Sequence, residues 1–130
     1  MGLGVEGTGL NYSDEVLRRV RVLERAGTLS GDQVGTGEVG TLDDGTVVRI
    51  QVMRSGDRIA EARFKVFGCS AAIASASLVA EWLDGAAIAE ARAVTAERVV
   101  QQLQLAPERE HVARMAVEAG LKAVNDSLRA

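Results

Sequence analysis

Apolar and polar residues alternate along the middle of the chain in two consecutive runs. In residues 46–53 apolar side chains alternate with polar ones, and the same alternation returns in residues 59–67. This period of two is typical of half-buried β-strands. The short turn sequence at residues 54–57 separates the runs and predicts an antiparallel hairpin, because parallel strands need a long crossover.

The segments around this hairpin complete the predicted fold. A short edge strand is expected at residues 36–41, within a glycine-rich stretch. Apolar residues spaced three and four apart predict helices elsewhere, and Ser13 and Thr95 are typical N-cap residues for two of them. Strands followed by helices predict an α+β fold, a small three-stranded antiparallel sheet with helices packed on one face. The expected helices span residues 14–26, ending near Gly27, then 70–83, 86–93, 96–104 and from Pro107 onward.

The composition excludes several classes of protein. Its 130 residues correspond to one domain, with residues 1–11, rich in glycine, expected to form a mobile tail and residues 12–130 the domain itself. The net charge of −3 argues against nucleic-acid binding. No apolar run approaches the ~20 residues of a membrane span. The single cysteine forms no internal disulfide and no secretory signal is visible, which favours a cytoplasmic protein.

A long motif lies where the predicted strands give way to helices. Residues 62–84 read ARFKVFGCSAAIASASLVAEWLD. This block closely resembles the central motif of the U-type iron–sulfur cluster assembly scaffolds, the IscU and NifU N-terminal family. Three shorter segments are similar to family motifs in the same order, namely YSDEV at 12–16, GEVG at 37–40 and LAPEREH at 105–111.

The resemblance implies a scaffold on which a cysteine desulfurase delivers sulfur and a [2Fe–2S] cluster is assembled. The family uses three cysteines for this, together with an aspartate and a histidine. The first cysteine falls on Asp44 here and the aspartate on Thr46, whereas the second cysteine is present as Cys69. The histidine is present as His111, and the third cysteine falls on Val112. The chain is therefore predicted to be a divergent member that lacks two of the three ligand cysteines.

The remaining candidate ligands are Cys69, His111 and Asp44, a thiolate, an imidazole and a carboxylate. A [2Fe–2S] cluster needs four protein ligands, mainly thiolates, and a hard carboxylate suits it poorly. We therefore expect that a monomer does not hold a stable cluster. A homodimer that shares Cys69 and His111 from both chains would supply four ligands. The same three residues would also suit a single zinc or iron ion with one open position.

Each candidate ligand also has an ordinary structural interpretation. Cys69 is equally typical of a small buried residue at a strand–helix turn, His111 of a surface or capping residue, and Asp44 of a turn before a strand. Three functions follow: a scaffold-like protein that needs a dimer or partner, a non-catalytic docking module that regulates a cysteine desulfurase or another assembly factor, or a small zinc-binding protein. No acid–base pair or nucleophile set emerges, so we do not expect an enzyme.

Overall fold

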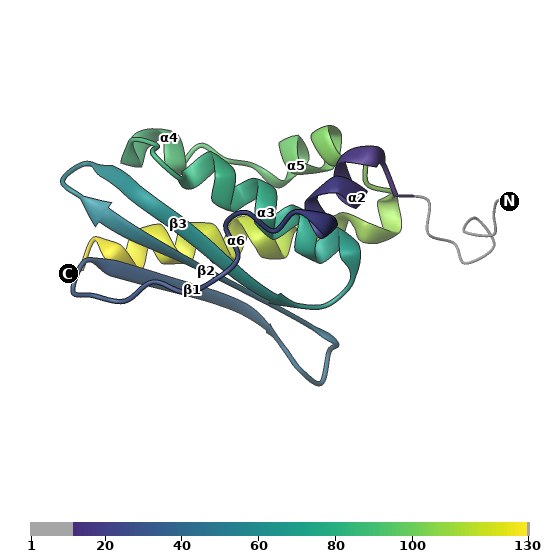
Figure 1. Cartoon of the computed structure of the whole chain (residues 1–130), viewed down its shortest axis with the longest axis horizontal. Helices are drawn as coiled ribbons and strands as arrows, with labels where there is room; N and C mark the ends of the chain where they lie inside the picture. The colour runs from purple at the N-terminus through teal and green to yellow at the C-terminus, as the bar shows by residue number, and fades with distance from the viewer. Residues whose placement is uncertain (1–11, 130) are drawn as a thin grey trace, which may run out of the picture.

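Three antiparallel strands form one sheet in the computed structural model of the protein, which describes residues 12–129 (Figure 1). The strands are β1 (Val34–Thr41), β2 (Thr46–Ser55) and β3 (Arg58–Phe67), and β2 lies between the other two. Each strand pairs with the next through a tight hairpin. The predicted α+β fold with a small three-stranded antiparallel sheet is confirmed. The predicted tail at residues 1–11 lies outside the described residues.

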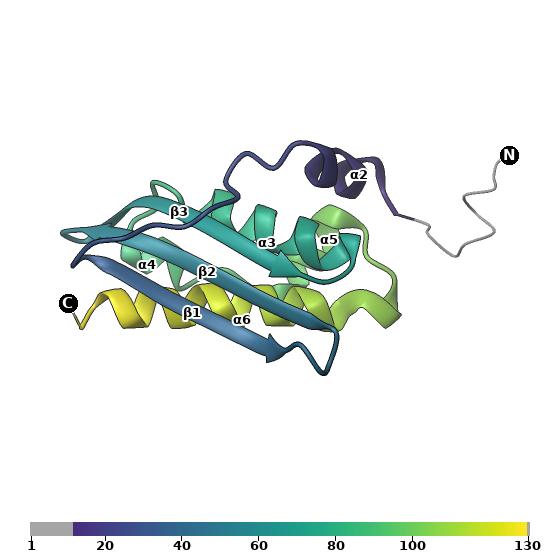
Figure 2. The same ribbon diagram turned by 60° about the horizontal axis from the view of Figure 1, so that its bottom comes forward.

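Two long helices cover one face of the sheet, as Figures 1 and 2 show. One follows β3 directly and its bounds match those predicted from the apolar spacing, and the other is the last element of the chain. None of the helices in residues 12–129 combines the length and the apolar character needed to cross a membrane. The helices are α2 (Asp14–Arg21), α3 (Ser70–Leu83), α4 (Ile88–Ala91), α5 (Ala96–Leu103), the 3-10 turn η1 (Pro107–Arg109) and α6 (Glu110–Ser127).

The core lies between the sheet and these two helices. Val48, Ile50 and Val52 of the central strand are fully buried, as their alternation predicts. On β1 the same face carries Gly35 and Gly37, which pair with Val52 and Ile50. A Cβ atom at Gly37 would collide with the backbone of α6, including the carbonyl oxygen of residue 119. The missing side chains therefore allow α6 to lie directly against β1.

The first helix ends earlier than predicted. Ser13 caps it as expected, since its hydroxyl accepts a hydrogen bond from the Val16 amide at 3.2 Å. The helix stops at Arg21, however, rather than near Gly27. The following residues pair instead with the free edge of β3, where the Phe64 amide donates to the Arg25 carbonyl and the Gly27 amide to the Phe64 carbonyl, both at 2.9 Å. The prediction was wrong because these partners lie far away in sequence.

Tertiary pairing also shortens the helix expected at residues 86–93. The Ile59 amide donates to the Ala86 carbonyl at 2.8 Å, and the Ile88 amide donates to the Asp57 carbonyl at the same distance. These bonds hold the residues before α4 in an extended conformation along β3. Only Ile88–Ala91 remains helical.

A crossover at residues 28–33 connects the edge of β3 to the start of β1 across the face of the sheet that carries no helix (Figure 2). Its Leu29 amide donates a 2.8 Å hydrogen bond to the side-chain oxygen of Gln51, and the Gln51 amide nitrogen donates to the Thr36 hydroxyl at 3.0 Å. Gln51 is only 8% exposed as a result. The crossover thus covers one half of this face and leaves the half near the β1–β2 turn uncovered.

A buried arginine attaches α2 to α3. Arg19 is 4% exposed and donates hydrogen bonds to Ser77 at 3.0 Å, to Glu81 at 2.9 Å and to Glu15 at 3.0 Å. Glu15 also accepts a hydrogen bond from Gln102 of α5. Burial alone would raise the pKa of Glu15, but the hydrogen bonds from Gln102 and Arg19 and the nearby positive charges outweigh it. The pKa of this carboxyl group is therefore lowered in the folded protein.

This lowered pKa predicts an acid-dependent contribution to stability. The folded-state pKa lies below the unfolded value of about 4.3, so the contribution is present above that pH and is lost as pH falls through the folded pKa. We expect Glu15→Gln to reduce the free energy of unfolding at pH 7 by about 0.5–1 kcal/mol. The difference from wild type should shrink below about pH 4.3, measured by urea unfolding across pH. Glu97→Gln, at an exposed position of α5, is the control, and an equal pH effect there would contradict the assignment.

Candidate functional site

Cys69 lies at the turn where the chain leaves the sheet and enters the helix layer. It occupies the N-cap position of α3, is partly buried, and its carbonyl accepts a 3.1 Å hydrogen bond from the Ile73 amide. Its side chain makes no capping hydrogen bond. The preceding Gly68 lies against the start of β2, because a Cβ atom there would be 3.2 Å from the methyl group of Thr46. The turn that carries Cys69 is therefore in contact with the start of β2, next to the β1–β2 turn.

Asp44 lies in the turn between β1 and β2, next to this contact. Its carboxylate accepts a 2.8 Å hydrogen bond from the Thr41 hydroxyl, and its amide donates to the same hydroxyl at 3.2 Å and to the Thr41 carbonyl at 3.1 Å. Gly45 then adopts a φ of +84°, which a glycine tolerates without strain. The Asp44 side chain is thus engaged in holding the turn.

His111 lies in the first turn of α6 and is exposed to solvent. One helical turn later, the tip of Met115 lies against Gly40, since a Cβ atom built there would be 2.7 Å from the Met115 methyl group. Residues four apart share a helix face, so His111 lies on the same side of α6 as Met115, one helical turn closer to the N-terminus of α6. Figure 2 shows the β1–β2 turn, the end of β3 and the start of α6 at one end of the molecule, opposite the C-terminus.

The comparisons with known proteins identify a family. The sequence model of one family, the NifU-like N terminal domain, matches residues 11–129. The chain belongs to this family. The match covers Cys69, Asp44 and His111 together, along with all the elements that the structure describes.

Similar proteins from two other organisms carry related names. The chain is 35% identical over 118 residues to the iron-sulfur cluster assembly scaffold protein IscU of Haemophilus influenzae, covering 88% of this chain and 94% of that protein. It is 34% identical over 118 residues to iron sulfur cluster assembly protein 1 of Trachipleistophora hominis, covering 89% and 86%.

Two solved structures share the fold of this family member. The N-terminal part of a NifU-like protein from Brucella abortus superposes with a TM-score of 0.71 at 18% identity, over 90% of this chain and 94% of that one. A putative iron-sulfur cluster assembly scaffold protein for the SUF system of Fervidobacterium islandicum gives a TM-score of 0.70 at 19% identity, over 87% and 96%.

The three predicted ligands share one end of the fold without forming a preorganised metal centre. Within residues 12–129, no group of three or more His, Cys, Asp and Glu side chains is placed to hold a metal ion. Val112, where the resemblance places the third cysteine, is fully buried in the core. Ligation by Cys69, His111 and Asp44 therefore stays a prediction.

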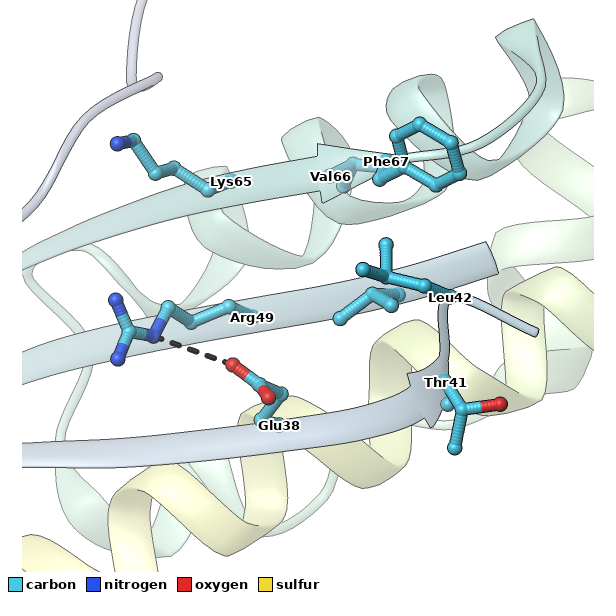
Figure 3. Close-up of a pocket in the computed structure, with 9 residues that line it drawn as sticks. Glu38, Thr41, Leu42, Arg49, Lys65, Val66 and Phe67 are labelled. Carbon is cyan, nitrogen blue, oxygen red and sulfur yellow. Dashed lines mark ion pairs between the residues drawn. The ribbon is translucent and has the colours of Figure 1, made fainter. Parts of the chain in front are cut away.

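Sequence reasoning missed a second feature at this end, an open hollow of about 460 Å³ on the uncovered half of the sheet (Figure 3). Its floor carries the charged side chains of Glu38, Arg49 and Lys65, and its end near the β1–β2 turn carries Leu42 and Phe67. The alternation in the sequence assigns Arg49 and Lys65 to the polar face. Only the strand register shows that they are direct neighbours.

The hydrogen bond between Asp44 and Thr41 is predicted to stabilise the turn between β1 and β2. Asp44→Ala and Thr41→Val should each lower the free energy of unfolding by about 0.5–1 kcal/mol, because each removes the exposed hydrogen bond between the two side chains. Thr41→Val also removes the hydroxyl that accepts from the Asp44 amide. The double variant should cost little more than either single one, since both act on one interaction. Urea unfolding in the presence of a chelator measures this cycle. Asp43→Ala is the matched control, and fully additive losses at 41 and 44 would contradict a shared interaction.

Proposed function

We propose that this protein is an iron–sulfur cluster assembly scaffold-like protein with a reduced ligand set, working with a cysteine desulfurase or another assembly factor. The observation that carries the proposal is the position of Cys69, between β3 and α3 within the long motif and at the end where the hairpin and α6 meet. The names of the relatives support it. The role proposed is assembly rather than enzymatic catalysis.

The donor set determines how the protein would handle its cargo. Cys69 is the only thiol of the chain, so it is the only side chain that can accept sulfur from a persulfide. In that step the Cys69 thiolate attacks the outer sulfur, a new S–S bond forms, and the donor cysteine leaves as a thiolate. Four ligands for a [2Fe–2S] cluster then require a second chain or a partner protein, because one chain offers a single thiolate and His111.

Replacing the turn aspartate by cysteine tests this ligand deficit. Wild-type protein, reconstituted anaerobically with iron, sulfide and reductant and then desalted, should retain little cluster absorption. Asp44→Cys should retain about fivefold more iron and sulfide per chain, because a soft thiolate replaces a hard carboxylate at the same end as Cys69 and His111. The measurements are visible absorption together with iron and sulfide analysis.

Two variants control this experiment. Asp43→Cys adds the same thiol one residue away and should gain less, and Asp44→Cys combined with Cys69→Ser should lose the gain. Equal retention by the Asp43 and Asp44 variants would mean that any added thiol binds iron and sulfide. Retention that persists without Cys69 would remove that residue from the proposed site.

A docking module without a cluster is the second candidate function. It is favoured by the structural use of two family ligand positions, since Asp44 holds a turn and Val112 fills the core. A single zinc or iron ion at Cys69, His111 and Asp44 is a weaker candidate, because within residues 12–129 no three such side chains are placed to hold a metal ion.

Binding to a desulfurase in the absence of metal tests the docking candidate. With purified desulfurase from the same organism and excess chelator, a docking module should bind and should change the rate of sulfide release. Cys69→Ser should bind equally well and change the rate equally, because no sulfur is carried. If the variant binds but no longer changes the rate, sulfur acceptance at Cys69 is required and the scaffold-like function is favoured.

A further inference from the structure

The uncovered half of the sheet is an exposed apolar and charged surface that no described element packs against. The crossover at residues 28–33 covers only the half of this face that contains Gln51. The other half carries the hollow of about 460 Å³. Leu42 and Phe67, at its end, are 69% and 58% exposed. Such a patch beside polar residues is typical of a protein-binding surface.

The charges on this surface form a row across the three strands. Glu38 on β1 pairs with Arg49 on β2, and Arg49 pairs with Lys65 on β3. The Glu38 carboxylate lies 3.5 Å from Arg49, whereas Lys65 forms no ion pair with any residue in 12–129. Like charges on directly opposite residues are destabilising. Figure 3 shows Lys65 on β3 apart from the Glu38–Arg49 ion pair. The β3 side of the row therefore favours an additional acidic group from outside the chain.

The next row toward the hairpin turn is apolar and uneven in height. Gly40, Val47 and Phe67 are neighbours across the strands, in the order β1, β2 and β3. Phe67 rises from the β3 side, while Gly40, whose side-chain position faces Thr46 and Met115 of α6, adds no side chain to this face on the β1 side. The surface thus carries the acidic Glu38 and the side-chain-free Gly40 on β1. On β3 it carries the basic Lys65 and the aromatic Phe67.

We propose that this surface binds a second copy of the same chain, sheet against sheet, about a two-fold axis parallel to the strands. Such an axis reverses the strand order, so Glu38 of each copy meets Lys65 of the other. The same operation places each Phe67 ring over the gap left by Gly40 of the other copy. Arg49 comes to lie near the axis, where Glu38 of its own chain already neutralises it. The surface is therefore complementary to itself in both charge and shape.

This pairing is independent of the proposed cluster chemistry. Cys69 lies beyond the end of β3, where the chain turns toward the helices on the opposite face, so stacked sheets leave it uncovered. Both Cys69 residues would lie at the same end of the pair. An interface confined to half of one sheet face is expected to be weak, with a dissociation constant on the order of tens of micromolar.

Charge reversal at the two complementary positions tests the proposal. The apo protein with chelator is followed by sedimentation velocity from about 5 to 500 μM at low salt. Wild type should dimerise with increasing concentration. Lys65→Glu and Glu38→Lys should each weaken the dimer at least about tenfold, because like charges then face each other, and the double variant should return to within about threefold of wild type.

Further variants separate this surface from general effects of charge. Lys122→Glu makes the same change on α6, in the opposite layer, and should leave the dissociation constant unchanged. Leu42→Ser should weaken the dimer without altering any charge. A wild-type protein that stays monomeric over the whole range overturns the proposal and leaves the surface to a different protein. Single reversals without effect, or a folded double variant that fails to recover, overturn it as well, and neither result bears on the cluster function.

Discussion

The close approach of α6 to β1 is the contact on which the remaining structure depends. It exists because β1 presents glycines at positions 35 and 37 to the helix, so backbone meets backbone where side chains would otherwise intervene. Gly120 of α6 in turn leaves room for side chains of α3, where a Cβ atom would lie 3.0 Å from a methyl group of Val79. A core built from small residues and containing few aromatics is consistent with layers this close.

This contact also determines the geometry of the candidate site. With α6 held along β1, its first turn extends past the hairpin base, and His111 reaches the end at which Cys69 leaves the sheet. The hairpin turn, the Cys69 turn and the first turn of α6 therefore lie at one end of the molecule. At this end the Asp44 carboxylate holds a turn, Val112 fills the core, and Cys69 carries a soft donor.

The two faces of the sheet differ in what covers them, and this difference separates the proposed functions from each other. Helices cover one face completely, and the crossover at residues 28–33 covers half of the other through Gln51. The proposed sulfur and metal chemistry would take place at the end of the molecule, at the turn that joins the sheet to the helix layer. The proposed self-association would use the uncovered half-face beside it. The two surfaces adjoin at Phe67, two residues before Cys69, without sharing a side chain.

The amino-acid sequence is sufficient to predict the strands, the bounds of α3, the cap at Ser13 and the family to which the chain belongs. These features depend on local periodicity, on hydrogen bonds within one turn of helix, or on a motif read residue by residue. It also brought Cys69, His111 and Asp44 forward as candidates, through the resemblance. The tertiary structure alone decided that α2 ends at Arg21, because its successors bind Phe64 of β3. The hydrogen bond between Asp44 and Thr41 and the row of Glu38, Arg49 and Lys65 are likewise visible only in the folded structure. Turn geometry and strand register bring these residues together, and their spacing along the chain does not reveal the contacts.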